Sequence, residues 1–265
     1  MKLFYNLLIG ILIGAGAILP GISSGVLCVI FGIYDKLINS VLEFFNDVKT
    51  NFKFLFPIVI GIGIGIILFG NILKSIFATY PIQTKFAFLG LILGCVPNLF
   101  KIANSKKGFR LHYLFYTIVS FILTLILLVL ENQFTTRNFV STQNPLFLIL
   151  SGFIMSIGIV VPGVSNTVLL MILGSYEIYL NAVSSVDISI LFPMGIGLVV
   201  GGLLFLKLAQ YFMQNYFSQT YYTIIGFVLG SLLILYPGFE FSFTGIISLI
   251  IFVLCFYVGK MFENS

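Results

Sequence analysis

The sequence predicts an all-α polytopic membrane protein with two inverted-topology repeats, each a re-entrant helical hairpin broken at a Pro-Gly pair plus three transmembrane helices. Three observations support this prediction: the composition, the spacing of the apolar segments, and a stretch of sequence that occurs twice. Of the 265 residues, 60% are hydrophobic and 8% are charged, and the mean hydropathy is +1.17. Because soluble domains carry about 25% charged residues, this composition excludes a water-soluble fold.

Ten apolar segments follow one another, and a helix needs about 20 apolar residues to cross a bilayer. The four segments beside the Pro-Gly pairs are compatible either with full spans or with hairpins that enter and leave on one side. The first segment also resembles a secretory signal ending in Ala15-Gly16-Ala17, but residues 5–41 have a counterpart at 147–183, which identifies them as structure. The segments cover residues 3–19, 22–42, 55–78, 83–100, 111–130, 146–161, 164–183, 190–212, 220–236 and 241–261.

The repeat is the strongest internal evidence for the architecture. Residues 17–41 read AILPGISSGVLCVIFGIYDKLINSV, and residues 159–183 read IVVPGVSNTVLLMILGSYEIYLNAV. Chance similarity between apolar helices is the alternative, but it does not easily match Pro, Gly, Tyr, Gln and Asn in order. Pairs 142 residues apart include Pro20/Pro162, Gly21/Gly163, Ser23/Ser165, Gly32/Gly174, Tyr34/Tyr176, Asp35/Glu177 and Asn39/Asn181. Pairs 136 residues apart include Pro57/Pro193, Gly61/Gly197, Tyr80/Tyr216, Gln83/Gln219, Thr84/Thr220, Gly90/Gly226 and Gly94/Gly230.

Each half holds five segments, so an odd number of crossings inserts the second half upside down. We expect a first repeat over 1–130, an outer connecting loop over 131–145, and a second repeat over 146–265. The loop KIANSKKGFR at 101–110 carries four Lys and Arg residues and is predicted to be cytoplasmic. Counting outward from it places ten of the 13 basic residues on the cytoplasmic side, together with both chain termini.

The Pro-Gly breaks are the candidate binding site for a phosphate group. A helix interrupted inside lipid must be buried in protein or line a wet cavity, and a helix that starts there offers unpaired N–H groups to an anion. We expect the tips of two hairpins, one from each face of the membrane, to meet near the midplane, as in transporters with inverted repeats. Simple packing kinks are the alternative. The candidate phosphate-binding residues are Pro20, Gly21, Ser23, Ser24, Gly25, Pro162, Gly163, Ser165, Asn166 and Thr167.

The charged residues of the apolar segments are few enough to consider singly. Asp35 and Glu177 are candidates for a proton-sensitive gate near opposite surfaces, or else charged helix ends in contact with water. Lys74, Lys85 and Lys207 are candidates for anion capture, with interfacial side chains reaching for water as the alternative. The cysteines all lie in apolar runs and fit small core residues, so we expect no metal site, no cofactor and no nucleic-acid partner.

The paired motifs PGISSGVLCVIFGIYD at 20–35 and PGVSNTVLLMILGSYE at 162–177, with FLGLILGCVPN at 88–98, resemble the polyprenyl-phosphate transporter family. The resemblance covers nearly the whole chain. It implies a membrane lipid transporter, rather than an enzyme, that moves undecaprenyl phosphate across the bacterial plasma membrane. The direction it implies is from the outer to the inner leaflet, so that the spent lipid carrier of cell-wall synthesis is reused.

Two other functions are compatible with broken, duplicated helices. A membrane-embedded polyprenyl-diphosphate phosphatase needs a base and a cationic clamp at its site, and no Glu, Asp, His or Arg lies close to either break in the sequence. A carrier of a small soluble anion would use the same helix ends. The oligomeric state, the prenyl chain length and the coupling ion stay open.

Overall fold

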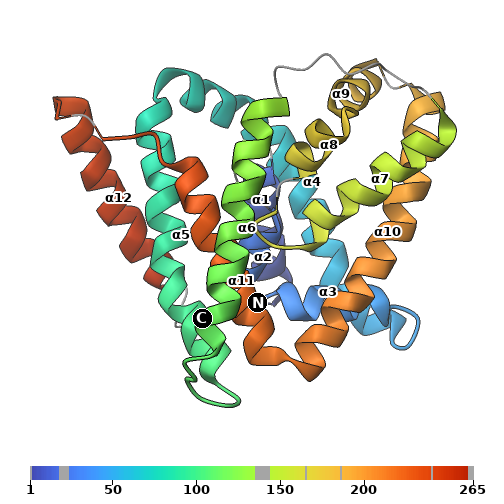
Figure 1. The fold of residues 1–265 in the computed structure, drawn as a ribbon, viewed down its shortest axis with the longest axis horizontal. Helices are drawn as coiled ribbons and strands as arrows, with labels where there is room; N and C mark the ends of the chain where they lie inside the picture. Colours follow the sequence, from blue (N-terminus) through green and yellow to red (C-terminus); the bar gives the residue numbers. More distant parts are fainter. Residues whose placement is uncertain are drawn as a thin grey trace.

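The computed structural model describes residues 2–17, 24–134, 144–164, 166–185, 187–239 and 241–261. Within these ranges the chain forms twelve α-helices and no strand (Figure 1). The first half contains α1 Lys2–Ala17, α2 Ser24–Ile30, α3 Tyr34–Leu42, α4 Val48–Thr79, α5 Pro81–Asn104 and α6 Tyr113–Phe134. The second half contains α7 Pro145–Val160, α8 Asn166–Leu173, α9 Tyr176–Ser185, α10 Ile188–Asn215, α11 Phe217–Leu235 and α12 Phe243–Met261.

Five helices of the described ranges are long and apolar enough to cross a membrane, namely α4, α5, α6, α10 and α12. Helices α1 and α7 are equally apolar but have 16 residues each. At 1.5 Å per residue, the 32 residues of α4 extend about 48 Å, beyond the roughly 30 Å of a hydrocarbon core. The chain is therefore an all-helical, multi-pass membrane protein, as its composition predicts.

The apolar segments that follow the two Pro-Gly pairs differ from expectation, because each is two short helices rather than one. The breaks fall at Gly32, with φ of 66°, and at Gly174, with φ of 76°. Such left-handed backbone is readily adopted by glycine and rarely by other residues. At Gly32 an added Cβ would meet no atom within 4 Å, so the turn needs glycine for its conformation and not for space. The sequence shows both glycines but cannot show that the helix turns there.

Other helix starts follow local sequence signals. The carboxylate of Asp47 accepts a hydrogen bond from the Thr50 N–H at 3.1 Å and caps α4. Asn144 caps α7 in the same way through the Leu146 N–H, just before Pro145 at the first helical position. Asp187 caps α10 through the Ser189 N–H. Short polar side chains at this position satisfy donors that the helix itself leaves unpaired.

The two halves use matching glycines to bring their helices together. Helix α1 packs against α4, and α7 packs against α10. An added Cβ on Gly61 would lie 2.4 Å from the Leu7 carbonyl oxygen, and one on its counterpart Gly197 would lie 1.8 Å from that of Ile149. Small residues at such contacts allow close approach of helix backbones in membranes. The equivalent residues of the sequence repeat therefore lie in equivalent interfaces.

The last two helices of each half pack across to the other half. Helix α5 packs against α12, and α11 packs against α6. An added Cβ on Gly90 would lie 2.2 Å from the Phe252 carbonyl oxygen, and one on its counterpart Gly226 would lie 2.3 Å from that of Thr117. The contact of α5 from the first half with α12 from the second is thus matched by the contact of α11 from the second half with α6 from the first. These two contacts join the halves.

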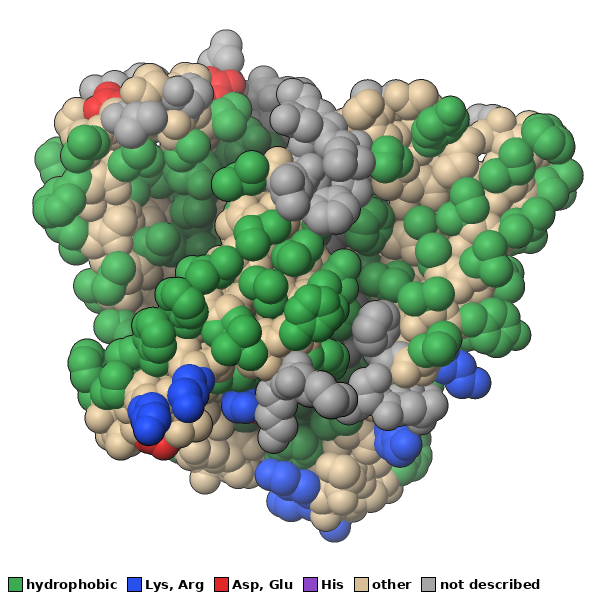
Figure 2. Space-filling view, turned by 180° about the vertical axis from the view of Figure 1, so that it is seen from behind, with side chains coloured by type: hydrophobic (Ala, Val, Ile, Leu, Met, Phe, Trp, Pro, Cys, Tyr) green, Lys and Arg blue, Asp and Glu red, His purple; other side chains and the backbone are tan. Residues whose placement is uncertain are grey.

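The molecule has two edges with different side chains. Helix α3 lies near the lower edge in Figure 1 and α9 near the upper edge, and both chain ends lie toward the lower part. Figure 2 shows Lys and Arg side chains gathered along the lower edge, below a broad hydrophobic belt. Acidic side chains are visible on the upper edge, where α9 and the start of α10 lie. An acidic side chain is also visible among the basic ones on the lower edge, so on this face the two sides of the belt differ in their Lys and Arg side chains.

Candidate functional site

The second Pro-Gly pair forms a tight connection between α7 and α8. Helix α7 ends at Val160, and Gly163 has a φ of 85°, which favours glycine. An added Cβ on Gly158 would lie 2.4 Å from the Asn166 nitrogen, so the end of α7 lies directly against the start of α8. An added Cβ on Gly163 would lie 2.7 Å from the Phe227 Cβ, which places this turn against α11. Pro162, Gly163 and Asn166 thus lie close together in this connection.

Parts of the predicted site lie outside the described residues. These are Pro20, Gly21, Ser23 and Ser165 and the side chains of Ser24, Thr167 and Lys74. Gly25 is buried in α2, and α2 contacts α7 of the second half. At seven and eight residues, α2 and α8 extend only about 10–12 Å. Neither short helix can cross a bilayer alone, and the meeting of the two tips stays a prediction.

Tyr34, from the first copy of the motif, reaches the break of the second copy. Its buried hydroxyl donates a hydrogen bond to the Val160 carbonyl oxygen at 2.6 Å. The last carbonyl groups of a helix have no partner within the helix, and Pro162 has no N–H to supply one. Tyr34 therefore closes the end of α7 and joins the two motifs directly.

Asp35 lies beside Tyr34 in the first turn of α3, near the lower edge. Its carboxylate accepts a hydrogen bond from the Tyr221 hydroxyl at 3.0 Å. Burial raises the pKa of Asp35 above its ordinary value, and the Tyr221 hydrogen bond and the charge of Lys106 offset only part of this effect. Glu177, its counterpart in α9, is exposed near the upper edge. The two acids thus lie toward opposite edges.

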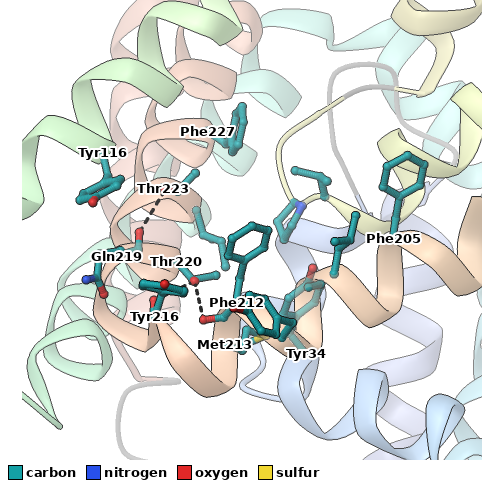
Figure 3. Close-up of a pocket in the computed structure, with 16 residues that line it drawn as sticks. Tyr34, Tyr116, Phe205, Phe212, Met213, Tyr216, Gln219, Thr220, Thr223 and Phe227 are labelled. Carbon is teal, nitrogen blue, oxygen red and sulfur yellow. Dashed lines mark hydrogen bonds between the residues drawn. The ribbon is translucent and has the colours of Figure 1, made fainter.

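A cavity of about 630 Å³ lies beside the second break (Figure 3). Its wall includes Val161 and Pro162 from the break and Tyr34 from α3. The size falls within the range of about 300–1,000 Å³ usual for ligand pockets. The remaining lining residues come from α6, α10, α11 and the residue between the last two helices: Tyr116, Phe205, Leu208, Ala209, Tyr211, Phe212, Met213, Tyr216, Gln219, Thr220, Thr223, Ile224 and Phe227. No residue in this lining is charged, and seven are aromatic.

Helix α11 contributes the amide of Gln219 and the hydroxyls of Thr220 and Thr223 to the cavity lining. Thr220 donates to the Phe212 carbonyl oxygen at 3.0 Å, and Thr223 donates to that of Gln219 at 3.0 Å. The Oε1 atom of Gln219 is buried without a hydrogen-bond partner among the described residues. In Figure 3, Gln219 and Tyr116 lie on one side of the cavity and Phe205 on the other. The arrangement suits an apolar chain that carries a small polar end.

The cavity is open to the molecular surface beside α6 and α10. Tyr116, Leu208, Tyr211, Phe212 and Tyr216 line it, and each keeps more than a third of its surface exposed. Helix α6 packs against α11 and α10 packs against α7. This part of the cavity wall is therefore accessible from outside the molecule.

The structure does not gather the predicted lysines into one cluster. Lys207 is exposed near the end of α10, next to Leu208 of the cavity wall. Lys85 is half-buried in the second turn of α5, which begins near the opposite edge in Figure 1. Lys106, which the sequence indicated only as an orientation signal, lies with its ammonium 4.0 Å from the centre of the Phe217 ring.

Metal chemistry finds no support among the described residues. No group of three His, Cys, Asp or Glu side chains in those ranges is placed to hold a metal ion. Cys28 and Cys95 are buried and Cys255 is half-buried, and all three are free thiols. The Cys95 thiol donates to the Gly259 carbonyl oxygen at 3.2 Å and so contributes to the packing of α5 on α12.

Sequence reasoning missed most of the cavity wall. Tyr116, Phe205 and Phe227 come from three helices, and nothing in an apolar helix distinguishes an aromatic residue of a cavity from one that faces lipid. A signal did exist for Gln219 and Thr220, because both match residues of the first half, Gln83 and Thr84. Polar residues retained in both copies of an apolar repeat were worth treating as site candidates.

Comparison with known proteins agrees with the resemblance noted in the sequence. Residues 13–246 match the VCA0040-like family, described as undecaprenyl phosphate translocase-like. A polyprenyl-phosphate transporter of Staphylococcus aureus is 30% identical over 96% of this chain and 94% of its own length. A polyprenyl-phosphate transporter of Vibrio cholerae is 26% identical over 87% of this chain and 77% of its own length. No solved structure matches. This chain therefore belongs to the VCA0040-like family of undecaprenyl phosphate translocase-like membrane proteins.

Proposed function

We propose that this protein transports a polyprenyl phosphate, in particular undecaprenyl phosphate, from the outer to the inner leaflet of the bacterial plasma membrane. The carrier lipid of cell-wall synthesis would thereby be recycled. The observation that carries this proposal is the aromatic cavity beside Pro162, which is open to the molecular surface and has no charged lining residue. The names of the two relatives support the same substrate class.

The cavity suits the prenyl chain, and the adjacent break suits the phosphate. The eight-residue α8 starts at Asn166, beside the cavity wall at Pro162, and a helix start favours negative charge. A phosphate dianion inside the apolar cavity itself would be costly to desolvate. The ten residues of the two breaks remain the predicted phosphate contacts, and Lys74, Lys85 and Lys207 remain candidates for its capture at the two edges.

The arrangement of helices supports two inverted repeats with re-entrant hairpins. The glycine contacts of α1 with α4 recur in α7 with α10, and those of α5 with α12 recur in α11 with α6. The equivalent helices α3 and α9 lie near opposite edges in Figure 1. The basic lower edge is the cytoplasmic side in this proposal, since Lys and Arg accumulate there in membrane proteins. Both termini then face the cytoplasm.

The two other functions receive less support. A phosphatase needs an acid, a base or a cationic clamp at the reacting phosphate, and the cavity lining contains no Asp, Glu, His, Lys or Arg. A carrier of a soluble anion has no use for an aromatic cavity without a charged lining residue. Neither function is favoured by a particular contact in the described part of the chain.

Reconstitution tests the proposal directly. Purified protein in liposomes is supplied with labelled undecaprenyl phosphate in one leaflet, and in parallel with labelled inorganic phosphate outside the liposomes. We expect the lipid to change leaflets and the soluble anion to stay outside. Movement of inorganic phosphate alone would favour the anion carrier, and release of phosphate from undecaprenyl diphosphate would favour the enzyme. In cells without this protein or a redundant transporter, undecaprenyl phosphate is expected to accumulate on the outer face.

A further inference from the structure

At the lower edge, α3 of the first half is held against the second half by polar contacts. The Asp35 carboxylate accepts from the Tyr221 hydroxyl of α11 at 3.0 Å. The Gln210 amide of α10 donates to Asn39 and to Glu43, each at 2.9 Å. Helix α3 also packs directly against α10. The lower edge is therefore closed by contacts between the halves.

The sequence repeat assigns counterparts in the other half to three of these residues. Glu177 of α9 corresponds to Asp35, and Lys85 of α5 corresponds to Tyr221. Lys74 of α4 corresponds to Gln210. The Asp35 carboxylate, which accepts from a neutral tyrosine hydroxyl at the lower edge, thus has as its counterpart a carboxylate, and the tyrosine has as its counterpart a lysine.

The backbone confirms that this correspondence has the right register. Tyr80 precedes α5 with φ of −131° and ψ of 59°, and Tyr216 precedes α11 with φ of −129° and ψ of 45°. The Thr84 hydroxyl donates to the Tyr80 carbonyl oxygen at 2.7 Å, and that of Thr220 donates to Tyr216 at 2.8 Å. Lys85 and Tyr221 each directly follow these threonines, so they occupy the same position in their helices.

Within the described ranges, the upper edge shows no counterpart of the Asp35–Tyr221 contact. Helix α9 packs against α8 and α10, and no packing onto α4 or α5 matches that of α3 on α10. Glu177 is exposed and Lys85 is half-buried. The described residues include no ion pair that involves either side chain. The two halves therefore use equivalent residues differently in the conformation seen here.

We propose that Glu177 and Lys85 form an ion pair that closes the upper edge in a second conformation, in which the Asp35–Tyr221 contact is broken. This inference rests on the proposed function, because transport requires the site to open to each side in turn. In an inverted repeat the second conformation arises when each half adopts the arrangement of the other. Lys85 is then free for an arriving phosphate while the upper edge is open, and it is neutralised by Glu177 once that edge closes.

Cysteine cross-linking tests the pair without measuring transport. Glu177→Cys and Lys85→Cys are combined in a protein whose Cys28, Cys95 and Cys255 are replaced by Ala, and the membranes are treated with a short thiol cross-linker. The matched control replaces Gln83, two residues from Lys85 and on another face of α5. We expect cross-linking from position 177 to 85 and not to 83. Absence of both products, or equal yields of both, would overturn the proposal.

Charge exchange gives an independent test that keeps the native cysteines. Glu177→Lys and Lys85→Glu are each expected to slow lipid transport about two- to fivefold, the size of an exposed ion pair, and the double variant is expected to recover. A double variant as slow as the product of the two single effects would contradict the pairing. If reconstituted protein moves no lipid but positions 177 and 85 still cross-link, the second conformation is supported and the proposed lipid substrate is contradicted.

Discussion

At the scale of single residues, Tyr34 of the first half contacts the second half directly. One hydroxyl closes the end of α7, and the same ring forms part of the cavity wall. The motif Gly-x-Tyr-Asp, seen in the sequence as a marker of repetition, thus has a structural role in the first copy. A residue of α3 thus forms part of a cavity built mostly from the second half.

Replacing Tyr34 by Phe tests this role. The change leaves the Val160 carbonyl oxygen buried without its partner, a loss that costs about 1–3 kcal/mol. We expect a lower unfolding temperature of the purified protein and slower lipid transport. Tyr257→Phe is the control, because Tyr257 is 62% exposed on α12. Equal behaviour of the two variants would show that the Tyr34 hydrogen bond carries no particular weight.

Asp35 predicts a pH-dependent stability. Burial raises its pKa above the ordinary value of 3.8, so the folded protein retains a proton that the unfolded chain releases. Stability should therefore fall as pH rises from that value through the raised pKa. Asp35→Asn cannot titrate, so the difference in unfolding temperature between wild type and variant should decrease from about pH 4 to about pH 8. A constant difference over this range would contradict the assignment.

At the scale of helices, glycine sets the distances at the interfaces. Where α1 meets α4 and α7 meets α10, the helix backbones approach closely because glycine has no side chain. A side chain at these positions would overlap a carbonyl oxygen of the other helix. Not every glycine has this role. An added Cβ on Gly63 or Gly195 would meet no atom within 4 Å, although each lies two residues from an interface glycine.

This difference gives a matched pair of variants on α10. Gly197→Ala should force α7 and α10 apart and destabilise the protein by about 1–3 kcal/mol, as overpacking does. Gly195→Ala should be neutral or stabilising by up to about 1 kcal/mol, because alanine favours helix more than glycine does. Thermal unfolding in detergent separates the two outcomes. A similar loss in both variants would mean that helix α10, and not its contact with α7, is sensitive to substitution.

At the scale of the whole molecule, the sequence predicted the helical membrane class and most helix positions. Apolar runs end where charged and capping residues begin, as at Asp47 and Asp187, so the borders of long helices are visible in the pattern. The turns at Gly32 and Gly174 were not visible in the sequence pattern, because a glycine inside an apolar run is equally compatible with a continuous helix. The repeat pairs these two glycines but does not say what they do.

The candidate site was predictable only where local chemistry marks it. Pro162 and Gly163 are recognisable because they interrupt a helix, and the structure places Pro162 in the cavity wall. The aromatic residues opposite them gather only through the packing of α6, α10 and α11, which no local pattern encodes. Long-range contacts such as Tyr34 to Val160, 126 residues apart, likewise depend on the complete fold.

The central claim is that the cavity beside the second break holds the prenyl chain of the transported lipid. Placing a photoreactive phenylalanine derivative at position 205, on the cavity wall, and at position 192, which is 67% exposed on the same helix, tests it most directly. With labelled undecaprenyl phosphate in the membrane, we predict a cross-linked adduct at 205 that unlabelled lipid displaces, and only non-displaceable background at 192. Equal, non-displaceable labelling at both positions would contradict the account.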